Sequence, residues 1–222
     1  MVELKIPDMP FIKRKKGKGA AVSKEAKEEG ETAEEELRRK IALYRRIIER
    51  YREIIEKAET KTVTELRSLI VPNDPVIIKL KDEILEEFRP YIFSKHFEAA
   101  ARKAYEFVLE EVANEELPVD FWLEPRDIVE LRAADEMDKA VLLCSLLRSM
   151  ECDSAKVIVE SNGERHVFVG FSVGKKYFLM DPAHRTIIDG RREDVLMKRF
   201  GGGNKQVYEF NDKEYDEIVG GE

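Results

Sequence analysis

Three residues that could act together in acyl-transfer chemistry occur in the second half of the chain: Glu136, His166 and Asp181. A histidine can take the proton of a nucleophile while an aspartate fixes the orientation of the imidazole. The 15 residues from His166 to Asp181 suffice for a strand, a tight turn and the next strand. We therefore expect the two side chains to be lateral neighbours in a sheet.

The elements that must position these residues are a helix and the strands after it. The segment Ala134–Ala140 opens an apolar helix, and the hydrophobic period then changes to two. Alternation predicts strands over 155–160, 165–173 and 177–180, with further short strands at 186–188 and 207–210. Before them, periodic apolar residues predict helices at 62–69, 75–88 and 93–113.

The order of short motifs is specific. Trp122-x-x-Pro125 comes first, then Ala134-Asp-Glu-Met-Asp-Lys-Ala140 with Leu142-Leu143, then His166, and last Asp181-Pro182. This order resembles the transglutaminase-like superfamily, whose papain-like fold carries a Cys-His-Asp triad. Archaeal and bacterial members typically show Trp-x-x-Pro and then Gly-Asp-Cys-x-Asp-x-Ala-x-Leu-Leu. The resemblance covers roughly residues 62–210.

The resemblance implies a role for each matched position. His166 matches the base and Asp181 the orienting acid, while Glu136 stands at the position of the cysteine and Ala134 at that of the glycine. The implied site is a degenerate triad with three cleft neighbours: Glu136, His166, Asp181, Trp122, Asp135 and Asp138. A nucleophilic cysteine at a helix start has its thiolate stabilised by the helix dipole, whereas a carboxylate there is a poor nucleophile.

The two cysteines, Cys144 and Cys152, are not placed to replace that nucleophile. Cys144 lies eight residues after Glu136, about 12 Å along the helix. Cys152 lies beyond the predicted helix end. Two cysteines form neither a disulfide framework nor a metal cluster, so we expect reduced, buried thiols.

These observations predict a catalytically inactive domain, a pseudoenzyme that binds a protein or another ligand. No metal and no cofactor are expected. The group at Glu136 could alternatively be a structural relic, a metal site built from one imidazole and two carboxylates, or a binding cleft. The inactive transglutaminase-like domain of nucleotide-excision-repair damage-recognition proteins is an analogy for the binding role. The alternative hypothesis is an active enzyme that uses one of the two thiols, namely a cysteine protease, amidase or transglutaminase.

Residues 1–31 form a polar tail for which we expect disorder. The tail joins an apolar residue to a basic run, and its candidate partner-binding residues are Phe11, Lys13, Arg14, Lys15, Lys16 and Lys18. A protein partner could dock there. Alternatively, residues 13–18 could contact nucleic-acid phosphates, which would make the chain an accessory factor in DNA repair or RNA metabolism.

Residues 32–60 read as one long amphipathic helix. Thr32 and Glu35 form a capping box at its start. Apolar residues follow in steps of four and three, which is the pattern of a coiled-coil seam: Leu37, Ile41, Tyr44, Ile48, Tyr51, Ile55 and Ala58. Residues 37–58 could self-associate or pack against another helix of the same chain.

The amino-acid composition limits the class of protein that the chain can be. The chain has 222 residues, 43% apolar and 38% charged, with a net charge of −7. An acidic body is not a general nucleic-acid binder, and no apolar run is long enough to span a membrane. One glutamine against many Glu, Lys and Arg is typical of a thermophile. We expect a cytoplasmic α+β protein with a disordered tail (1–31), a heptad helix (32–60) and a transglutaminase-like domain (62–215). That domain has a helical half (62–115), then a central helix packed on an antiparallel sheet (122–210).

Overall fold

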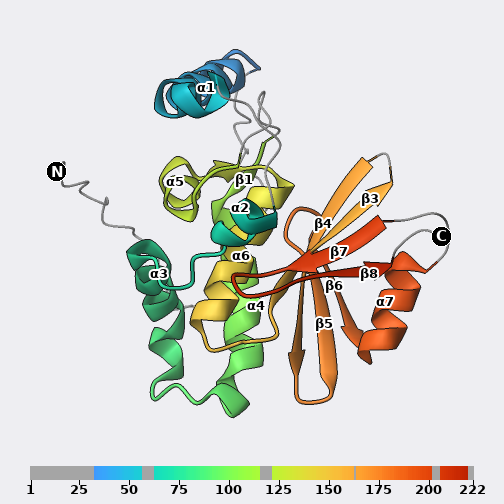
Figure 1. The fold of residues 1–222 in the computed structure, drawn as a ribbon. Coiled ribbons are helices and arrows are strands. Elements are labelled where there is room, and N and C mark those ends of the chain that lie inside the picture. The colour runs from blue at the N-terminus through green and yellow to red at the C-terminus, as the bar shows by residue number, and fades with distance from the viewer. Residues whose placement is uncertain (1–32, 57–62, 116–121, 163, 202–205, 220–222) are drawn as a thin grey trace, which may run out of the picture. The chain divides into compact units, whose positions relative to one another are not determined.

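The computed structural model describes residues 33–56, 63–115, 122–162, 164–201 and 206–219 (Figure 1). The chain separates into two units whose boundary falls between Arg50 and Tyr51, within helix α1 (Ala33–Glu56). The helix begins directly after Thr32, where the capping box predicts its start. The predictions for the tail, Phe11 and the basic residues 13–18 included, lie outside the described residues.

The helices of the second unit precede most of its strands. Those expected from periodicity are found at nearly the predicted bounds: α2 (Val63–Ser68), α3 (Pro75–Leu85) with the 3-10 turn η1 (Glu86–Phe88), α4 (Phe93–Glu111) and α6 (Glu136–Ser149). Asp74 caps α3 by accepting the Val76 N–H at 2.8 Å, with Pro75 in the first turn. Two short helices had not been predicted, α5 (Pro125–Leu131) and α7 (Arg192–Phe200).

A six-stranded antiparallel sheet follows in the order β6-β5-β4-β3-β7-β8. Its strands are β3 (Lys156–Asn162), β4 (Glu164–Val173), β5 (Lys176–Asp181), β6 (Thr186–Gly190), β7 (Gln206–Phe210) and β8 (Tyr215–Val219). All but β8 were predicted. A separate parallel pair joins β1 (Ala113–Asn114) to β2 (Ala133–Ala134), just before α6.

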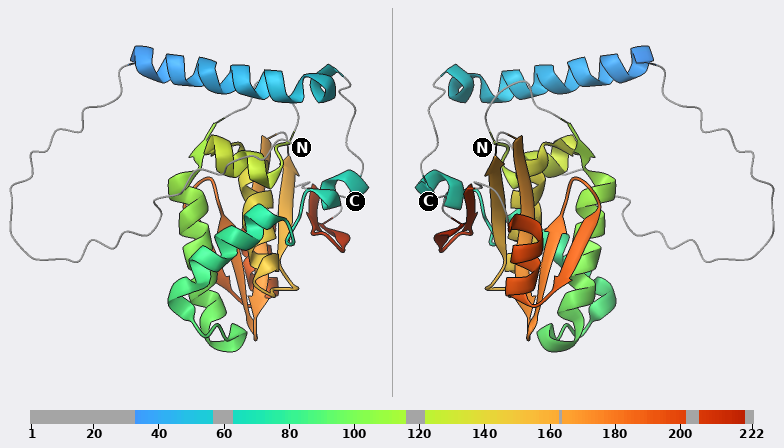
Figure 2. Two further views of the ribbon diagram at one scale, coloured as in Figure 1. Left: turned by 90° about the vertical axis from the view of Figure 1, so that its left-hand side faces the viewer. Right: turned by 90° about the vertical axis from the view of Figure 1, so that its right-hand side faces the viewer.

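Helices cover both faces of the sheet. Helices α4 and α6 lie on one face and α7 lies on the other (Figures 1 and 2). On the α4 side, Phe97 meets Phe171 edge to face, and Phe171 stacks on Phe178. On the α7 side, Phe168 meets Phe200 edge to face. Successive side chains of β4 therefore point to opposite faces of the sheet and pack into two hydrophobic layers.

Helix α6 is the centre of this arrangement, because every side chain from Met137 to Arg148 is buried. A helix that is buried all round needs apolar residues all round, which the run Ala140–Leu147 supplies. The fold class is α+β, as predicted, with the central helix packed on an antiparallel sheet. That is the arrangement expected of a papain-like core.

Candidate functional site

Glu136 is the first residue of α6, and Asp135 caps the helix. One carboxylate oxygen of Asp135 accepts the Asp138 N–H at 2.8 Å, and the other lies 3.5 Å from the Arg165 guanidinium. The Glu136 side chain is partly exposed. The structure thus places a carboxylate at the helix N-terminus, where the partial positive charge of the helix favours an anion.

Asp181 is the last residue of β5, and its side chain organises the turn into β6. One carboxylate oxygen accepts the N–H groups of Ala183 at 2.9 Å and His184 at 2.8 Å. An aspartate that binds the backbone two and three residues further on is a common way to close a tight turn. The turn that it closes carries His184.

His184 bridges the two carboxylates. Its Nδ1 lies 3.2 Å from the second Asp181 oxygen, and its Nε2 lies 3.5 Å from Glu136 Oε1. An imidazole can donate from both ring nitrogens only when it is protonated. The geometry places one imidazole between two carboxylates, in the order Glu136, His184, Asp181.

The sequence predicts His166 as the base beside Glu136, whereas the imidazole in ion-pair range of Glu136 is that of His184. His166 pairs with Glu160 in the β3–β4 register, and the Glu160 carboxylate lies 2.8 Å from Arg199 of α7. The pairing of β4 with β5 ends at Val169↔Met180, so His166 lies beyond the last paired residue. Within the described chain, His166 makes neither a hydrogen bond nor an ion pair with Glu136. The imidazole that does is three residues after Asp181.

The electrostatics of Glu136 agree with this geometry. Burial raises the pKa of Glu136, and the nearby carboxylates of Asp181 and Asp135 raise it further. His184 is the largest opposing influence, and His166 lowers the pKa less. His166 is therefore a secondary electrostatic neighbour of Glu136.

Two residues of the α6 motif hold neighbouring segments in place. Asp138 is fully buried, and its Oδ1 accepts the N–H of Leu123, next to the half-buried Trp122, at 2.9 Å. The Lys139 ammonium, also buried, donates to the Val112 carbonyl oxygen at the end of α4, at 2.9 Å. Asp138 was predicted to line a cleft, but in the structure it fixes the chain that leads into α5.

Tyr105 and Arg185 complete the surroundings of the His184 turn. The Tyr105 hydroxyl on α4 donates to the Asp181 carbonyl oxygen at 2.7 Å, with the Thr186 carbonyl oxygen 3.2 Å away. Arg185 has a φ of 55°, a left-handed conformation that costs a non-glycine residue about 1 kcal/mol. The Asp181 side chain and the Tyr105 hydroxyl tether the backbone of the turn that carries His184.

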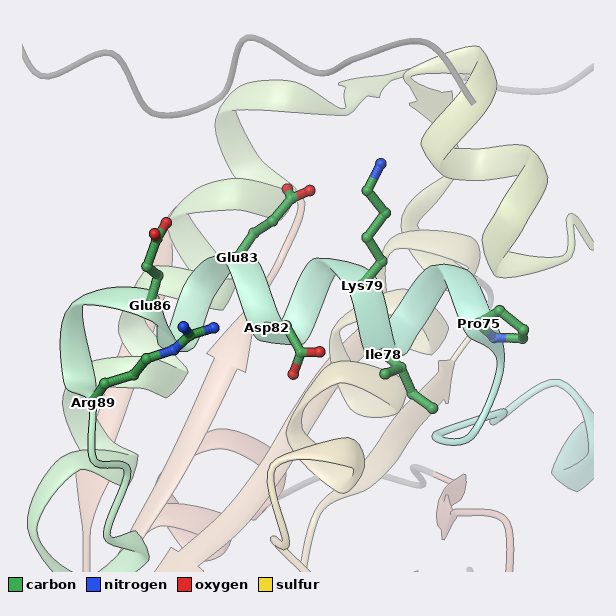
Figure 3. A pocket seen from close by; sticks show the side chains of 7 residues that line it. All are labelled: Pro75, Ile78, Lys79, Asp82, Glu83, Glu86 and Arg89. Carbon is green, nitrogen blue, oxygen red and sulfur yellow. The ribbon is translucent and has the colours of Figure 1, made fainter. Parts of the chain in front are cut away.

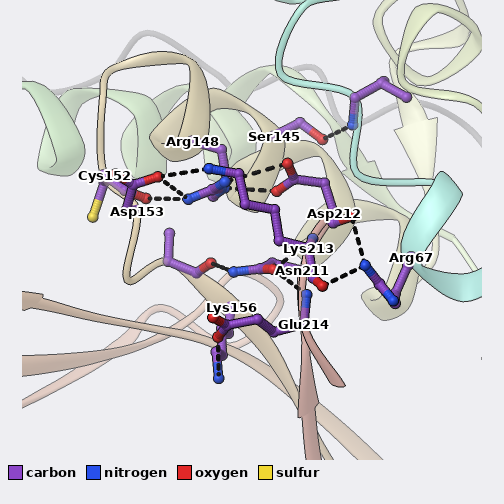
Figure 4. Close-up of polar contacts among 12 residues, drawn as sticks. Arg67, Ser145, Arg148, Cys152, Asp153, Lys156, Asn211, Asp212, Lys213 and Glu214 are labelled. Carbon is purple, nitrogen blue, oxygen red and sulfur yellow. Dashed lines mark hydrogen bonds and ion pairs between the residues drawn. The ribbon is translucent and has the colours of Figure 1, made fainter. Parts of the chain in front are cut away.

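The two thiols are far from solvent. Cys144 is fully buried in α6 and Cys152 is 1% exposed, and burial raises the pKa of both thiols. Both lie near Arg148, whose guanidinium bonds Asp212 at 2.7 and 3.2 Å and Asp153 at 2.9 Å (Figure 4). Arg67 of α2 donates to the Asp212 carbonyl oxygen at 3.2 Å. This cluster ties the end of α6 to the β7–β8 turn and leaves neither thiol accessible.

The remaining features of the described residues are a surface groove and two negative findings. A groove runs along α3 and η1 and shares no residue with the Glu136 site (Figure 3); its lining residues are Pro75, Ile78, Lys79, Asp82, Glu83, Glu86 and Arg89. Among the residues that the structure describes, no group of His, Cys, Asp or Glu has the arrangement of a metal site. In the same part of the chain, no helix combines the length and the apolar character that crossing a membrane requires.

No family model and no curated protein matches the sequence. Among solved structures, LapG of Legionella pneumophila is similar at 13% identity and a TM-score of 0.48, over 73% of this chain and 91% of LapG. Its calcium-bound form gives 12% identity and a TM-score of 0.46, over 79% and 90% of the two chains. Likeness at this level assigns no activity or ligand to this chain, so its function has to be argued from its own residues.

Proposed function

We propose that this protein is a catalytically inactive transglutaminase-like domain that acts as a protein-interaction or ligand-binding module. The observation that carries the proposal is the Glu136 carboxylate at the start of α6, 3.5 Å from His184 Nε2. In a cysteine enzyme a thiolate would face that nitrogen. The motif order from Trp122 to Asp181 supports the superfamily.

The thiols of this chain support the loss of catalysis. A reactive cysteine needs a thiolate, and thiolates form where a positive charge or a helix N-terminus lowers the pKa. Cys144 and Cys152 are buried and have raised pKa values. Neither provides a nucleophile for acyl transfer.

Labelling of the folded protein with iodoacetamide tests the loss of catalysis. Intact-mass spectrometry should show no rapid adduct between pH 6 and 7.5, about the range in which low-pKa thiols react. The same protein in denaturant should take up two adducts, one for each cysteine. Rapid modification of either thiol in the folded state would show a reactive cysteine and contradict the proposal.

The binding role needs a comparison of variants. A ligand of this site should contact Glu136 or the His184 turn, so a Glu136→Ala/His184→Ala variant should lose it. Arg126→Ala is a matched control, because Arg126 is an exposed charged residue that pairs with Asp74 at 3.1 Å outside the site. A partner captured equally by all three proteins would not be a ligand of this site.

A further inference from the structure

Helix α1 exposes a row of large apolar side chains. Leu37 is 58% exposed, Ile41 51% and Ile48 44%, and Tyr44 lies between them in the row. Six large apolar side chains are exposed in the described part of the chain, and three of them lie here. Scattered exposed apolar residues are ordinary, but a row on one helix face marks an interaction surface.

The row has the spacing of a helix–helix seam. Leu37 and Tyr44 occupy heptad position d, and Ile41 and Ile48 occupy position a. Apolar residues at positions a and d form the seam of a coiled coil. Leu43 at position c and Ile47 at position g add to the apolar face, and Ile47 is buried. Nucleic-acid backbones require no apolar row. The spacing therefore favours a second helix as the occupant.

Most residues beside the seam are basic, with the buried Ile47 at position g as the exception. Arg38 and Arg45 occupy position e, and Lys40 occupies position g. Residues 37–50 contain six Lys or Arg and a single acidic residue, Glu49. Side chains at e and g meet those of the partner helix and set partner choice.

A second copy of this chain fits the seam poorly. A parallel pair would set Lys40 of one helix against Arg45 of the other. An antiparallel pair would set Arg38 against Arg45. Like charges at such positions destabilise pairing in either orientation.

We propose that the α1 seam, formed by Leu37, Ile41, Tyr44 and Ile48, binds an amphipathic helix of another protein whose apolar stripe is flanked by acidic residues. Charge complementarity selects this partner over a second copy of the chain. The proposal is independent of the function proposed for the Glu136 site, since α1 shares no residue with that site.

The test uses the full chain and two synthetic helical peptides. Both carry Ile and Leu at a and d over about four heptads, one with Glu and the other with Lys at e and g. Fluorescence anisotropy should show the acidic peptide binding about tenfold or more tightly than the basic one, with a preference that weakens as salt rises.

Variants assign the binding to the seam. Ile41→Ser/Ile48→Ser should abolish peptide binding, while circular dichroism should show an unchanged helix content because both positions are exposed. Ile78→Ser is the matched control, since Ile78 is a 37% exposed isoleucine on α3. Arg38→Glu/Arg45→Glu should reverse the preference and favour the basic peptide.

Three results would overturn the proposal. The two peptides could bind equally well. The protein could form a dimer in sedimentation that Ile41→Ser/Ile48→Ser abolishes, which would make a second copy the occupant. Anionic lipid vesicles or duplex DNA could bind through Arg38 and Arg45 while neither peptide binds.

Discussion

At the scale of single residues, the position of His184 bears directly on the proposed loss of catalysis. A catalytic imidazole takes a proton from a nucleophile, so one ring nitrogen must be free to accept. Here Nδ1 faces Asp181 and Nε2 faces Glu136, and neither carboxylate has a proton to give when ionised. An ionised Glu136 therefore offers His184 no proton to take, which is the residue-level basis of the proposed loss of catalysis.

The titration of Glu136 should report this bridge. His184→Ala should raise the pKa of Glu136 further, because the largest influence that lowers it is removed. His166→Ala should raise it less, since His166 is the smaller influence. Carbon-13 NMR of the Glu136 carboxyl group measures both shifts. A larger effect from His166→Ala would contradict the assignment of His184.

Lys139 should make stability depend on alkaline pH. Burial, followed by the charge of Arg185, lowers the pKa of Lys139 from its ordinary 10.5 to about 8. Between pH 8 and pH 10.5, the unfolded chain binds more protons than the folded chain. The free energy of unfolding therefore rises with pH over this range. The stability gained is lost again as the pH falls to 8.

Urea unfolding of the wild type and of Lys139→Met isolates the contribution of Lys139. The variant loses the bond to the Val112 carbonyl oxygen, which is a constant offset, and it loses the titration. From pH 8 to 10.5, the unfolding free energy of the wild type should therefore rise relative to that of Lys139→Met. A difference that stays constant would show that the ammonium is not desolvated.

At the scale of elements, the start of α6 acts as a clamp for the segments around it. Asp138→Ala removes the acceptor of the Leu123 N–H and should destabilise the protein by about 1–3 kcal/mol. Asp138→Asn keeps a carbonyl oxygen in the same position and should cost less. Chemical denaturation measures both variants, and equal stabilities of the two would deny Asp138 this role.

The far end of α6 depends on Arg148. Arg148→Met leaves Asp212 without its paired guanidinium and should cost about 2–4 kcal/mol. Arg126→Met, which breaks the more exposed pair with Asp74, should change stability by less than about 1 kcal/mol. Thermal or urea unfolding compares the two variants, and a loss that is no larger for Arg148→Met would contradict a structural role for the cluster.

Long elements with a clear hydrophobic period could be predicted from the sequence, and short ones could not. Helices α3 and α4 and strands β3 to β7 begin and end close to the predicted residues. Helix α7 was missed because most of its residues are charged and its fully buried apolar contacts come from Val195 and Phe200. The pair β1–β2 has two residues per strand and thus no period to detect.

The site could be predicted in part. The sequence predicts Glu136 at the start of a helix and Asp181 at the end of a strand, and both lie there in the structure. His184 was not among the predicted residues, because the resemblance places the histidine on a strand and His184 follows Asp181 in a turn. The Asp-Pro-Ala-His sequence was the available signal, since an aspartate at the start of a turn bonds the backbone just after it.

At the scale of the whole molecule, the proposal is that the architecture would position a nucleophile at residue 136, where this chain has a carboxylate. Helix α6 aims its N-terminus at the turn that carries His184, and Tyr105 of α4 anchors that turn. Replacing the carboxylate with a thiol should therefore complete the geometry. A thiol at residue 136 would sit at a helix N-terminus beside an imidazole, and both features lower a thiol pKa.

The pH dependence of iodoacetamide labelling of Glu136→Cys tests this account most directly. The new thiol should react with a midpoint below about 8.5, the ordinary cysteine pKa, while buried Cys144 and Cys152 stay unlabelled. Adding His184→Ala should raise the midpoint, and adding His166→Ala should change it less. A midpoint at or above the ordinary value, or one that responds mainly to His166→Ala, would contradict the site as it is described.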